Sequence, residues 1–403
     1  MNKTNLNLHP VAGVYLGACA AKIKKNGNTD LVVIKFCDEA LTAAAFTLNA
    51  FCAAPVTLAK KNLNSMSPKA LLINSGNANA GTGEQGMTDA IQSCQWVAKE
   101  LGCDEQQVLP FSTGVIGENL PMEKLQNGIP MALSNLSISG WESACQGIMT
   151  TDLVPKMVSK VIDINGSAMT ITGMSKGSGM IHPNMATMLG FVATDAKINQ
   201  ACLDQCVKDA VNLSFNRITV DGDTSTNDAC TLTATQQADM AEINSIDSAE
   251  YTQFAAEINA VMTELAQMIV RDGEGATKFV SIIVESGESA EECLKVAHAV
   301  ALSPLVKTAL FASDPNWGRI LAAVGRSGVE NLDINALKIY LGDVCIVENG
   351  GRALSYTEES GQAVMNQTDI DILIQLNRGE ASETVWTTDF SYDYVKINAE
   401  YRT

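Results

Sequence analysis

The chain is organised around residues 173–196, which read GMSKGSGMIHPNMATMLGFVATDA. The glycine-rich residues 176–179 allow a close backbone approach and positive φ angles, and Pro183 then fixes a turn. Residues 185–193 are apolar enough to form a buried strand. The hydroxyl of Thr187 is therefore expected where a tight turn enters a buried strand.

The pair Ala186-Thr187 suits self-cleavage. A hydroxyl is a poor nucleophile until a base removes its proton, and the α-amine of the same residue can be that base once the preceding peptide bond is broken. A small residue before the cut and a nucleophile after it favour an N-to-O acyl shift followed by hydrolysis. By itself, however, such a pair more often begins an ordinary β-strand, where threonine is common. The pair alone leaves both interpretations open.

Several further motifs favour self-cleavage. Residues 176–191, KGSGMIHPNMATMLGF, resemble the autoprocessing segment of the ornithine acetyltransferase family, the glutamate N-acetyltransferases of arginine biosynthesis. Gly81 is a departure, because the family pattern has a cysteine there. The other blocks that resemble the family follow in family order and cover nearly the whole chain: residues 77–80, 112–117, 149–152, 221–228, 271–276 and 396–399.

The resemblance implies an α/β fold, a layered α+β sandwich, with an N-terminal threonine nucleophile made by self-cleavage. Cleavage between Ala186 and Thr187 would give an alpha chain of residues 1–186 and a beta chain of residues 187–403. The two chains would interleave in one folded unit, and the family pairs two cleaved protomers. Thr187 would act in both cleavage and turnover.

Acyl transfer also needs hydrogen-bond donors for the oxyanion of the tetrahedral intermediate. The resemblance assigns this role to the Thr113 hydroxyl and the Gly114 backbone N–H. Read alone, residues 112–114 would be a turn after Phe111. A glycine at 114 is nevertheless what a closely approaching backbone donor requires, so the two interpretations agree.

The resemblance assigns further residues to the substrate. Lys176 would suit an amino-acid carboxylate, and Glu274, between two glycines, would suit the ammonium of ornithine. Thr150, Asn398 and the terminal Thr403 are assigned by resemblance alone, together with Thr187. In isolation Lys176 would be a solvated lysine, since the GxxxxGK[ST] order of a phosphate loop is absent.

Two other features have simpler explanations. Residues 221–228 resemble the start of a calcium loop, but Leu232 stands twelfth in place of glutamate, so calcium binding is excluded and a bracing role for the segment is expected. His182 lies near Thr187 and suggests a Thr-His dyad. An N-terminal amine already supplies a base, which argues against that dyad.

Composition excludes several partners. The net charge of −18 argues against nucleic acid and anionic membranes. Eleven cysteines without a CxxC pair, and only three histidines, argue against zinc and metal sites and indicate reduced thiols in the cytoplasm. Cys202 and Cys206 are expected on one helical face. Residues 41–59 carry no charge, but Asn49 and Pro55 argue against a membrane span.

Periodicity predicts several elements. Pro121 is expected to open a helix, and Asn165-Gly166 predicts a hairpin turn. The remaining predictions are a strand at 70–73, a helix at 87–101 closed by Gly102, helices at 198–211 and 251–269, and a one-faced strand at 370–376.

Three functions remain. The first is cofactor-free, ping-pong transfer of acetyl from N-acetylornithine to glutamate on Thr187, with acetyl-CoA left open as a second donor. The second is an N-terminal-nucleophile amidohydrolase or aminopeptidase, in which water deacylates the enzyme. A requirement for glutamate in ornithine release would distinguish these two. The third is a non-catalytic binding protein, against which the intact Thr187, Thr113-Gly114 and Glu274 set argues.

Overall fold

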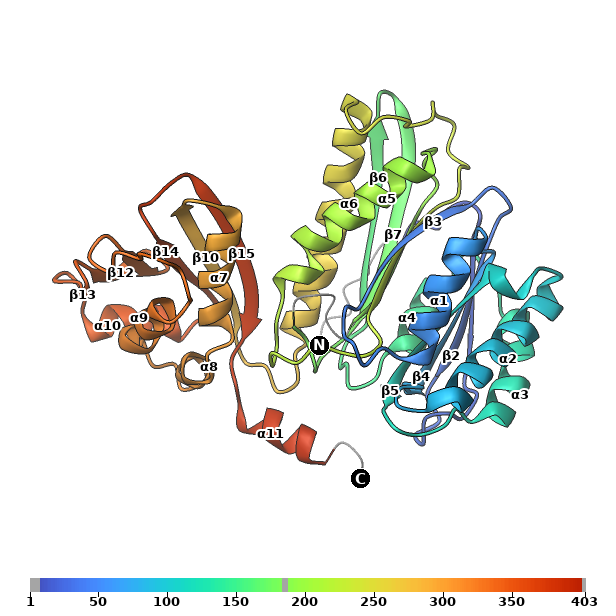
Figure 1. The fold of residues 1–403 in the computed structure, drawn as a ribbon, viewed down its shortest axis with the longest axis horizontal. Helices are drawn as coiled ribbons and strands as arrows, with labels where there is room; N and C mark the ends of the chain where they lie inside the picture. The colour runs from blue at the N-terminus through green and yellow to red at the C-terminus, as the bar shows by residue number, and fades with distance from the viewer. Residues whose placement is uncertain (1–7, 183–187, 401–403) are drawn as a thin grey trace. The chain divides into compact units, whose positions relative to one another are not determined.

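A computed structural model describes residues 8–182 and 188–400 of the 403-residue chain. The chain divides into two compact units. The first unit comprises residues 1–177, 184–216 and 223–269, and the second comprises residues 178–183, 217–222 and 270–403. In Figure 1 the first unit carries the blue to yellow elements and the second carries the orange and red ones.

The first unit contains a four-stranded sheet in the order β1-β2-β4-β5. Strands β4 and β5 are parallel and place Gly76 opposite Gly114. The sheet therefore presents the end of β5, with its glycine, beside the end of β4. The bounds are β1 Val14–Cys19, β2 Leu31–Phe36, β4 Ala70–Asn77 and β5 Val108–Val115.

The second sheet of this unit has five strands in the order β3-β9-β8-β7-β6. Strands β7 and β8 pair antiparallel, and Lys176 lies opposite Leu189. Strands from both sides of the predicted cut therefore form one sheet. The bounds are β3 Leu41–Phe46, β6 Lys156–Ile164, β7 Ser167–Lys176, β8 Leu189–Thr194 and β9 Ala229–Ala234.

The two sheets face each other across a hydrophobic core. Phe111 of the first sheet meets Phe191 of the second edge to face, with ring centroids 5.2 Å apart. Helices α2 and α3 pack on the outer face of the first sheet, and α5 and α6 lie along the second (Figure 1). This helix–sheet–sheet–helix sandwich confirms the expected fold class. The helices are α1 Ala54–Ser65, α2 Gly83–Leu101, α3 Met122–Ser134, α4 Trp141–Ile148, α5 Gln200–Leu213 and α6 Ala249–Arg271.

The second unit contains a six-stranded sheet in the order β13-β12-β11-β14-β10-β15. Helices α7 to α10 share a core with this sheet. The strands are β10 Phe279–Gly287, β11 Lys338–Leu341, β12 Val344–Glu348, β13 Gly351–Arg352, β14 Asp369–Gln375 and β15 Ala381–Thr388. The helices are α7 Ala290–Ala301, α8 Pro304–Phe311, α9 Trp317–Gly325, α10 Glu358–Met365 and α11 Tyr392–Ala399.

Most expected elements are confirmed. The β6–β7 hairpin turns at Asn165 and Gly166, both with positive φ, and α2 ends at a left-handed Gly102. The alternating residues of β14 bury Ile370, Ile372 and Ile374 on one face. The helices predicted at 198–211 and 251–269 correspond to α5 and α6, and Pro121 immediately precedes α3.

Two boundaries differ from the prediction by four residues. Strand β4 continues through polar residues to Asn77, because Asn74 is buried and hydrogen-bonded to the Asn77 carbonyl and the Ser112 hydroxyl. Helix α2 begins four residues earlier than predicted, at Gly83. The strand predicted at 185–193 is described only from residue 188, and β8 begins at Leu189.

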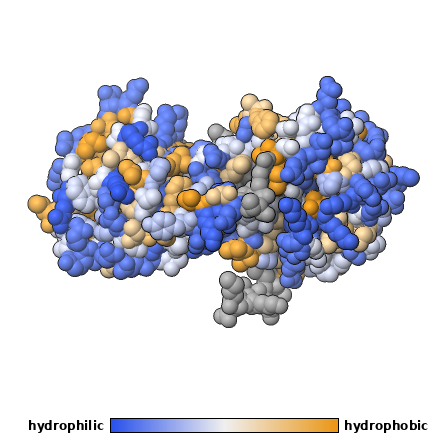
Figure 2. All heavy atoms as spheres, turned by 90° about the horizontal axis from the view of Figure 1, so that it is seen from below, coloured by the Kyte–Doolittle hydropathy of each residue, from blue (hydrophilic) through white to orange (hydrophobic). Residues whose placement is uncertain are grey.

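The cysteines and the surface agree with the composition. All eleven cysteines are free, and Cys202 and Cys206 are both buried on α5. Figure 2 shows a face that is mostly hydrophilic, with smaller hydrophobic areas between. Within the described ranges no single helix is long and apolar enough to cross a membrane; α7 and α8 meet that criterion only together, and they are bent by 58°.

Gly17 in β1 allows the backbone of α3 to lie against the strand, since a Cβ at this position would overlap the Ala132 carbonyl oxygen. We expect Gly17→Ala to destabilise the protein by at least about 2 kcal/mol through overpacking and to lower its thermal melting temperature. Gly325→Ala is the control, because nothing lies within 4 Å of a Cβ there. Equal melting temperatures for the two variants would contradict this close packing.

Candidate active site

The oxyanion residues predicted from the sequence lie at the end of β5. Gly114 has φ of 134°, and a Cβ on it would lie 2.5 Å from the Asn77 backbone nitrogen. Only glycine fits this approach to β4. Thr113 precedes it and is 5% exposed. The two residues therefore occupy a tightly packed strand end, with Thr113 buried and Gly114 half-buried, rather than a surface turn.

Lys176 lies against Thr113. It is the last residue of β7 and is 3% exposed, and its Nζ donates a hydrogen bond to Thr113 Oγ1 at 2.9 Å. Because an ammonium group can only donate, the Thr113 oxygen is the acceptor, and its own proton stays available for another oxygen. The structure thus brings together two residues that the sequence placed 63 positions apart, and Lys176 is not the solvated lysine expected of it in isolation.

A buried carboxylate organises the backbone around Lys176. Asp152 accepts hydrogen bonds from the N–H of Thr150 at 2.9 Å and of Gly177 at 2.7 Å, and it forms a 2.7 Å ion pair with Lys156. Burial by itself raises the pKa of Asp152, but the ammonium groups of Lys156 and Lys176 and the Gly177 N–H outweigh it and lower the pKa to about 2. Asp152 therefore stays ionised and holds both flanking segments.

Sequence reasoning missed this role of Asp152. The residue stands inside the quoted 149–152 block, and its only further signal is a lysine four positions later. That spacing is common on exposed helices, whereas here Asp152 follows α4, Lys156 begins β6, and both side chains are fully buried. The sequence offered no means of telling the two situations apart.

In the second unit, Glu274 and Asn398 are brought together. Asn398 on α11 donates its side-chain N–H to Glu274 Oε2 at 2.8 Å, and the Glu274 backbone N–H donates to the Ser178 carbonyl at 2.9 Å. Gly275, with φ of 68°, lets the α11 cap residue Ser391 come within 2.5 Å of where its Cβ would be. Two substrate residues predicted from the sequence thus share one hydrogen bond.

The segment 221–228 begins with Asp221, which accepts three hydrogen bonds within the second unit. Asp221 accepts hydrogen bonds from the N–H of Met180 at 2.6 Å and of Ile181 at 2.9 Å, both upstream of the predicted cut. It also accepts one from the Tyr394 hydroxyl at 3.2 Å. Tyr394 is one helical turn before Asn398 on α11, so the same aspartate connects the glycine-rich segment with the helix that holds Glu274.

The end of the segment has a similar role in the first unit. Asn227 donates to the carbonyls of Ala78 at 2.7 Å and Ser112 at 3.0 Å, which supports the approach to Thr113. Asp228 accepts the Met188 N–H at 3.0 Å, and burial raises its pKa well above the usual range. These contacts agree with the bracing role expected from the sequence.

Three predicted residues, Ala186, Thr187 and Thr403, lie outside the described residues. Their roles stay predictions. His182, considered as a partner for the nucleophile, packs its ring against that of His298, with centroids 6.2 Å apart. Burial, together with the charges of His182 and Arg217, lowers the pKa of His298 to about 4. His182 therefore faces a neutral ring.

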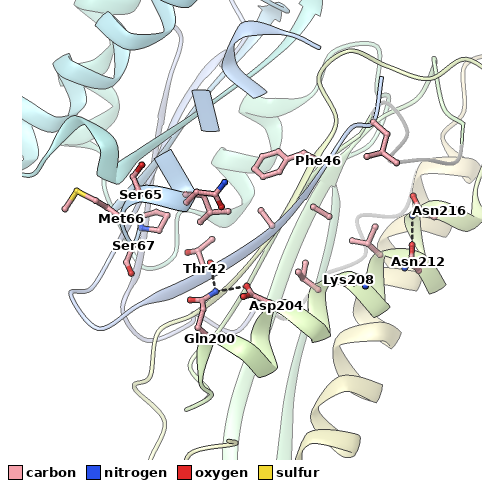
Figure 3. Close-up of a pocket in the computed structure, with 18 residues that line it drawn as sticks. Thr42, Phe46, Ser65, Met66, Ser67, Gln200, Asp204, Lys208, Asn212 and Asn216 are labelled. Carbon is pink, nitrogen blue, oxygen red and sulfur yellow. Dashed lines mark hydrogen bonds between the residues drawn. The ribbon is translucent and has the colours of Figure 1, made fainter. Parts of the chain in front are cut away.

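A groove of about 910 Å³ lies elsewhere in the first unit, between β3, the end of α1 and α5 (Figure 3). Gln200 spans part of it, donating to the Thr42 carbonyl and to Asp204. The residues that line the groove include none of the predicted catalytic or substrate residues that the structure describes.

The chain matches known proteins over nearly its whole length. The ArgJ family model matches residues 15–403. The arginine biosynthesis bifunctional protein ArgJ of Pseudomonas syringae pv. tomato is 55% identical over 396 residues, and that of Pseudomonas fluorescens is 54% identical over 396 residues; each alignment covers 98% of both chains. The crystal structure of the arginine biosynthesis bifunctional protein argJ from Bacillus halodurans has a TM-score of 0.51 at 36% identity and covers 53% of this chain and 100% of that one.

Such identity over the full length cannot come from a few shared motifs. The alignment covers 98% of the chain and therefore extends through both units. The resemblance found in the sequence is therefore confirmed, and the chain belongs to the ArgJ family.

Proposed function

We propose that this chain transfers an acetyl group from N-acetylornithine to glutamate, with Thr187 carrying the acetyl between the two half-reactions. Membership of the ArgJ family carries the proposal, since relatives at 55% and 54% identity are named arginine biosynthesis bifunctional proteins. The same word, bifunctional, supports acetyl-CoA-dependent acetylation of glutamate as a second activity.

The chemistry divides into two acyl transfers. The α-amine of Thr187 takes the hydroxyl proton while the oxygen attacks the acetyl carbonyl, and the tetrahedral intermediate collapses when the leaving amine of ornithine takes up that proton. Glutamate then attacks the acetyl ester with its neutral amine, and Thr187 recovers its proton. Thr113 and Gly114 would donate to the oxyanion in both steps. The contact from Lys176 supports this, because it leaves the Thr113 proton free to point at the intermediate.

The substrate contacts follow from charge. Glu274 would bind the side-chain ammonium of N-acetylornithine. Asn398 would orient the Glu274 carboxylate through its hydrogen bond. Lys176 would bind the α-carboxylate that both amino acids share. Thr150, whose backbone is held by Asp152, would contact the substrate from the same unit as Lys176. Thr403 completes the proposed set on the strength of the sequence resemblance.

Self-cleavage between Ala186 and Thr187 would yield chains of residues 1–186 and 187–403. The sheet that joins β7 to β8 supports their staying together, because its hydrogen bonds do not depend on the intervening loop. We include two copies of each chain in the proposal. Eleven free cysteines support a reducing compartment such as the cytoplasm.

The alternative is an amidohydrolase that uses the same nucleophile, with water as the acceptor. The two functions differ in one measurement, the dependence of ornithine release on glutamate. Release that accelerates with glutamate and yields N-acetylglutamate supports the transferase, and release at an unchanged rate supports the hydrolase.

Thr187→Ala should remain a single chain, because it lacks the hydroxyl that starts the acyl shift. Intact mass and denaturing gels of the wild type should show fragments 1–186 and 187–403, and the variant should show one species without transferase activity. Thr194→Ala, at the last residue of β8, is the control and should still be cut. A wild type that stays uncut would overturn the assignment of Thr187.

Thr113→Val should lower kcat roughly a hundredfold with little change in KM, as expected when one oxyanion donor is lost. Thr113→Ser keeps a hydroxyl and should retain most of the activity. Steady-state kinetics on material checked for cleavage would decide this. Equal kcat for the valine and serine variants would exclude a hydrogen bond from residue 113.

Glu274→Gln should raise the KM for N-acetylornithine by about tenfold or more, because a charge-assisted contact with the ammonium becomes a neutral one. The exposed Glu380→Gln is the control for the change of charge. Initial rates at varied N-acetylornithine and saturating glutamate provide the comparison. An unchanged KM in Glu274→Gln would place the ammonium elsewhere.

A further inference from the structure

The two substrates of a ping-pong transferase differ in charge. N-acetylornithine carries one carboxylate and one ammonium, whereas glutamate that is ready to attack has a neutral amine and two carboxylates. Removing a second carboxylate from water without a partner of opposite charge is costly. The acceptor therefore needs a cation that the donor does not, and this requirement rests on the proposed function.

A second lysine flanks the oxyanion residues in the first unit. The stem of Lys24 lies against Gly76, since a Cβ on Gly76 would be 3.2 Å from Lys24 Cγ and 3.4 Å from its backbone nitrogen. Gly76 is the strand partner of Gly114. Lys24 thus packs against the residue of β4 that pairs with Gly114. Lys176 contacts Thr113 directly.

The loop that carries Lys24 is held in place. Asp30 is fully buried, and its carboxylate accepts the backbone N–H of Ala21 at 2.6 Å and of Lys24 at 2.9 Å. Lys24 Nζ donates to the Thr29 carbonyl at 2.9 Å. This uses one of the three protons of the ammonium group. The backbone of the half-buried Lys24 is therefore held by Asp30, and its ammonium group has two further N–H donors for a ligand.

Lys24 and the charged groups around it together carry one more positive than negative charge, in a chain of net charge −18. Lys176 and Asp152 are close enough to act on its charge, as is Asp30. Asp152 is already paired with Lys156 in a buried ion pair. The charged groups of this cluster are Lys24, Lys156 and Lys176 on one side and Asp30 and Asp152 on the other.

We propose that Lys24 is a specificity-determining residue that binds the side-chain carboxylate of the acceptor glutamate, while Lys176 binds the α-carboxylate common to both substrates. The donor half-reaction does not need Lys24, because N-acetylornithine brings a single carboxylate. The acceptor half-reaction does, because a second carboxylate without a cation would be desolvated unpaired.

The experiment separates the half-reactions in the cleaved enzyme. Lys24→Met should leave the burst of ornithine from N-acetylornithine unchanged and should raise the KM for glutamate by about tenfold or more, the loss expected for one charge-assisted hydrogen bond. Glutamine, which lacks the side-chain charge, serves as the second acceptor. Its KM should be the same in the wild type and in Lys24→Met.

Lys25→Met is the matched control, since it removes the same charge from the next, exposed residue. An equal rise in the KM for glutamate in both variants would mean that only the overall charge matters. A slowed ornithine burst, or an equal loss with glutamine, would overturn the side-chain assignment. If ornithine release by the wild type does not depend on glutamate, the proposed transferase function is refuted instead. The folding of each variant is checked by its self-cleavage and its melting temperature.

The pH dependence gives a second readout. Burial lowers the pKa of Lys24 to about 8, with Lys176 adding to the shift and Asp30 and Asp152 opposing it. Lys24 is therefore charged below pH 8 and becomes neutral above it. The KM for glutamate in Lys24→Met divided by that in the wild type should be largest below pH 8 and should fall toward one at higher pH. A pH-independent ratio would contradict the proposal.

Discussion

The hydrogen bond from Lys176 to Thr113 connects the two sheets of the first unit, because Lys176 ends β7 and Thr113 lies near the end of β5. A buried hydrogen bond to a charged group contributes about 1.5–3 kcal/mol. This contact therefore stabilises the approach of the two strand ends. Asp152 stabilises this contact, because its carboxylate accepts hydrogen bonds from the backbone N–H of Gly177, next to Lys176, and from that of Thr150.

Residues 221–228 hold the described backbone on both sides of the predicted cut. Their first carboxylate holds Met180 and Ile181, and their last holds Met188, so the described flanks of the predicted cut are fixed by backbone hydrogen bonds to side chains. Acyl transfer requires reacting groups to be placed within a fraction of an ångström. A short polar segment with a half-buried acceptor at Asp221 and a buried one at Asp228 provides such placement without any hydrophobic core of its own.

The sequence predicted the hairpin at Asn165 and the helices α5 and α6, because their signals are local: turn residues and apolar periodicity. The sandwich was expected from the family resemblance. Through the family motifs the sequence also predicted which residues would take part in the reaction. It did not reveal that Lys176 meets Thr113, or that Asp152 is buried with Lys156, because such contacts depend on how separate strands pack. Lys24 was missed for the same reason. In the sequence it is an ordinary loop lysine, and only the structure shows that its stem packs against Gly76.

The pairing of β7 with β8 has a consequence for the lifetime of the enzyme. In an uncut chain, bringing these strands together is an intramolecular step whose entropic cost is modest. If the chain is cut as proposed, the same hydrogen bonds join two separate polypeptides, so recovery from full unfolding requires two chains to meet and depends on their concentration. A mature enzyme of this design would be long-lived because it unfolds slowly, rather than because it refolds readily.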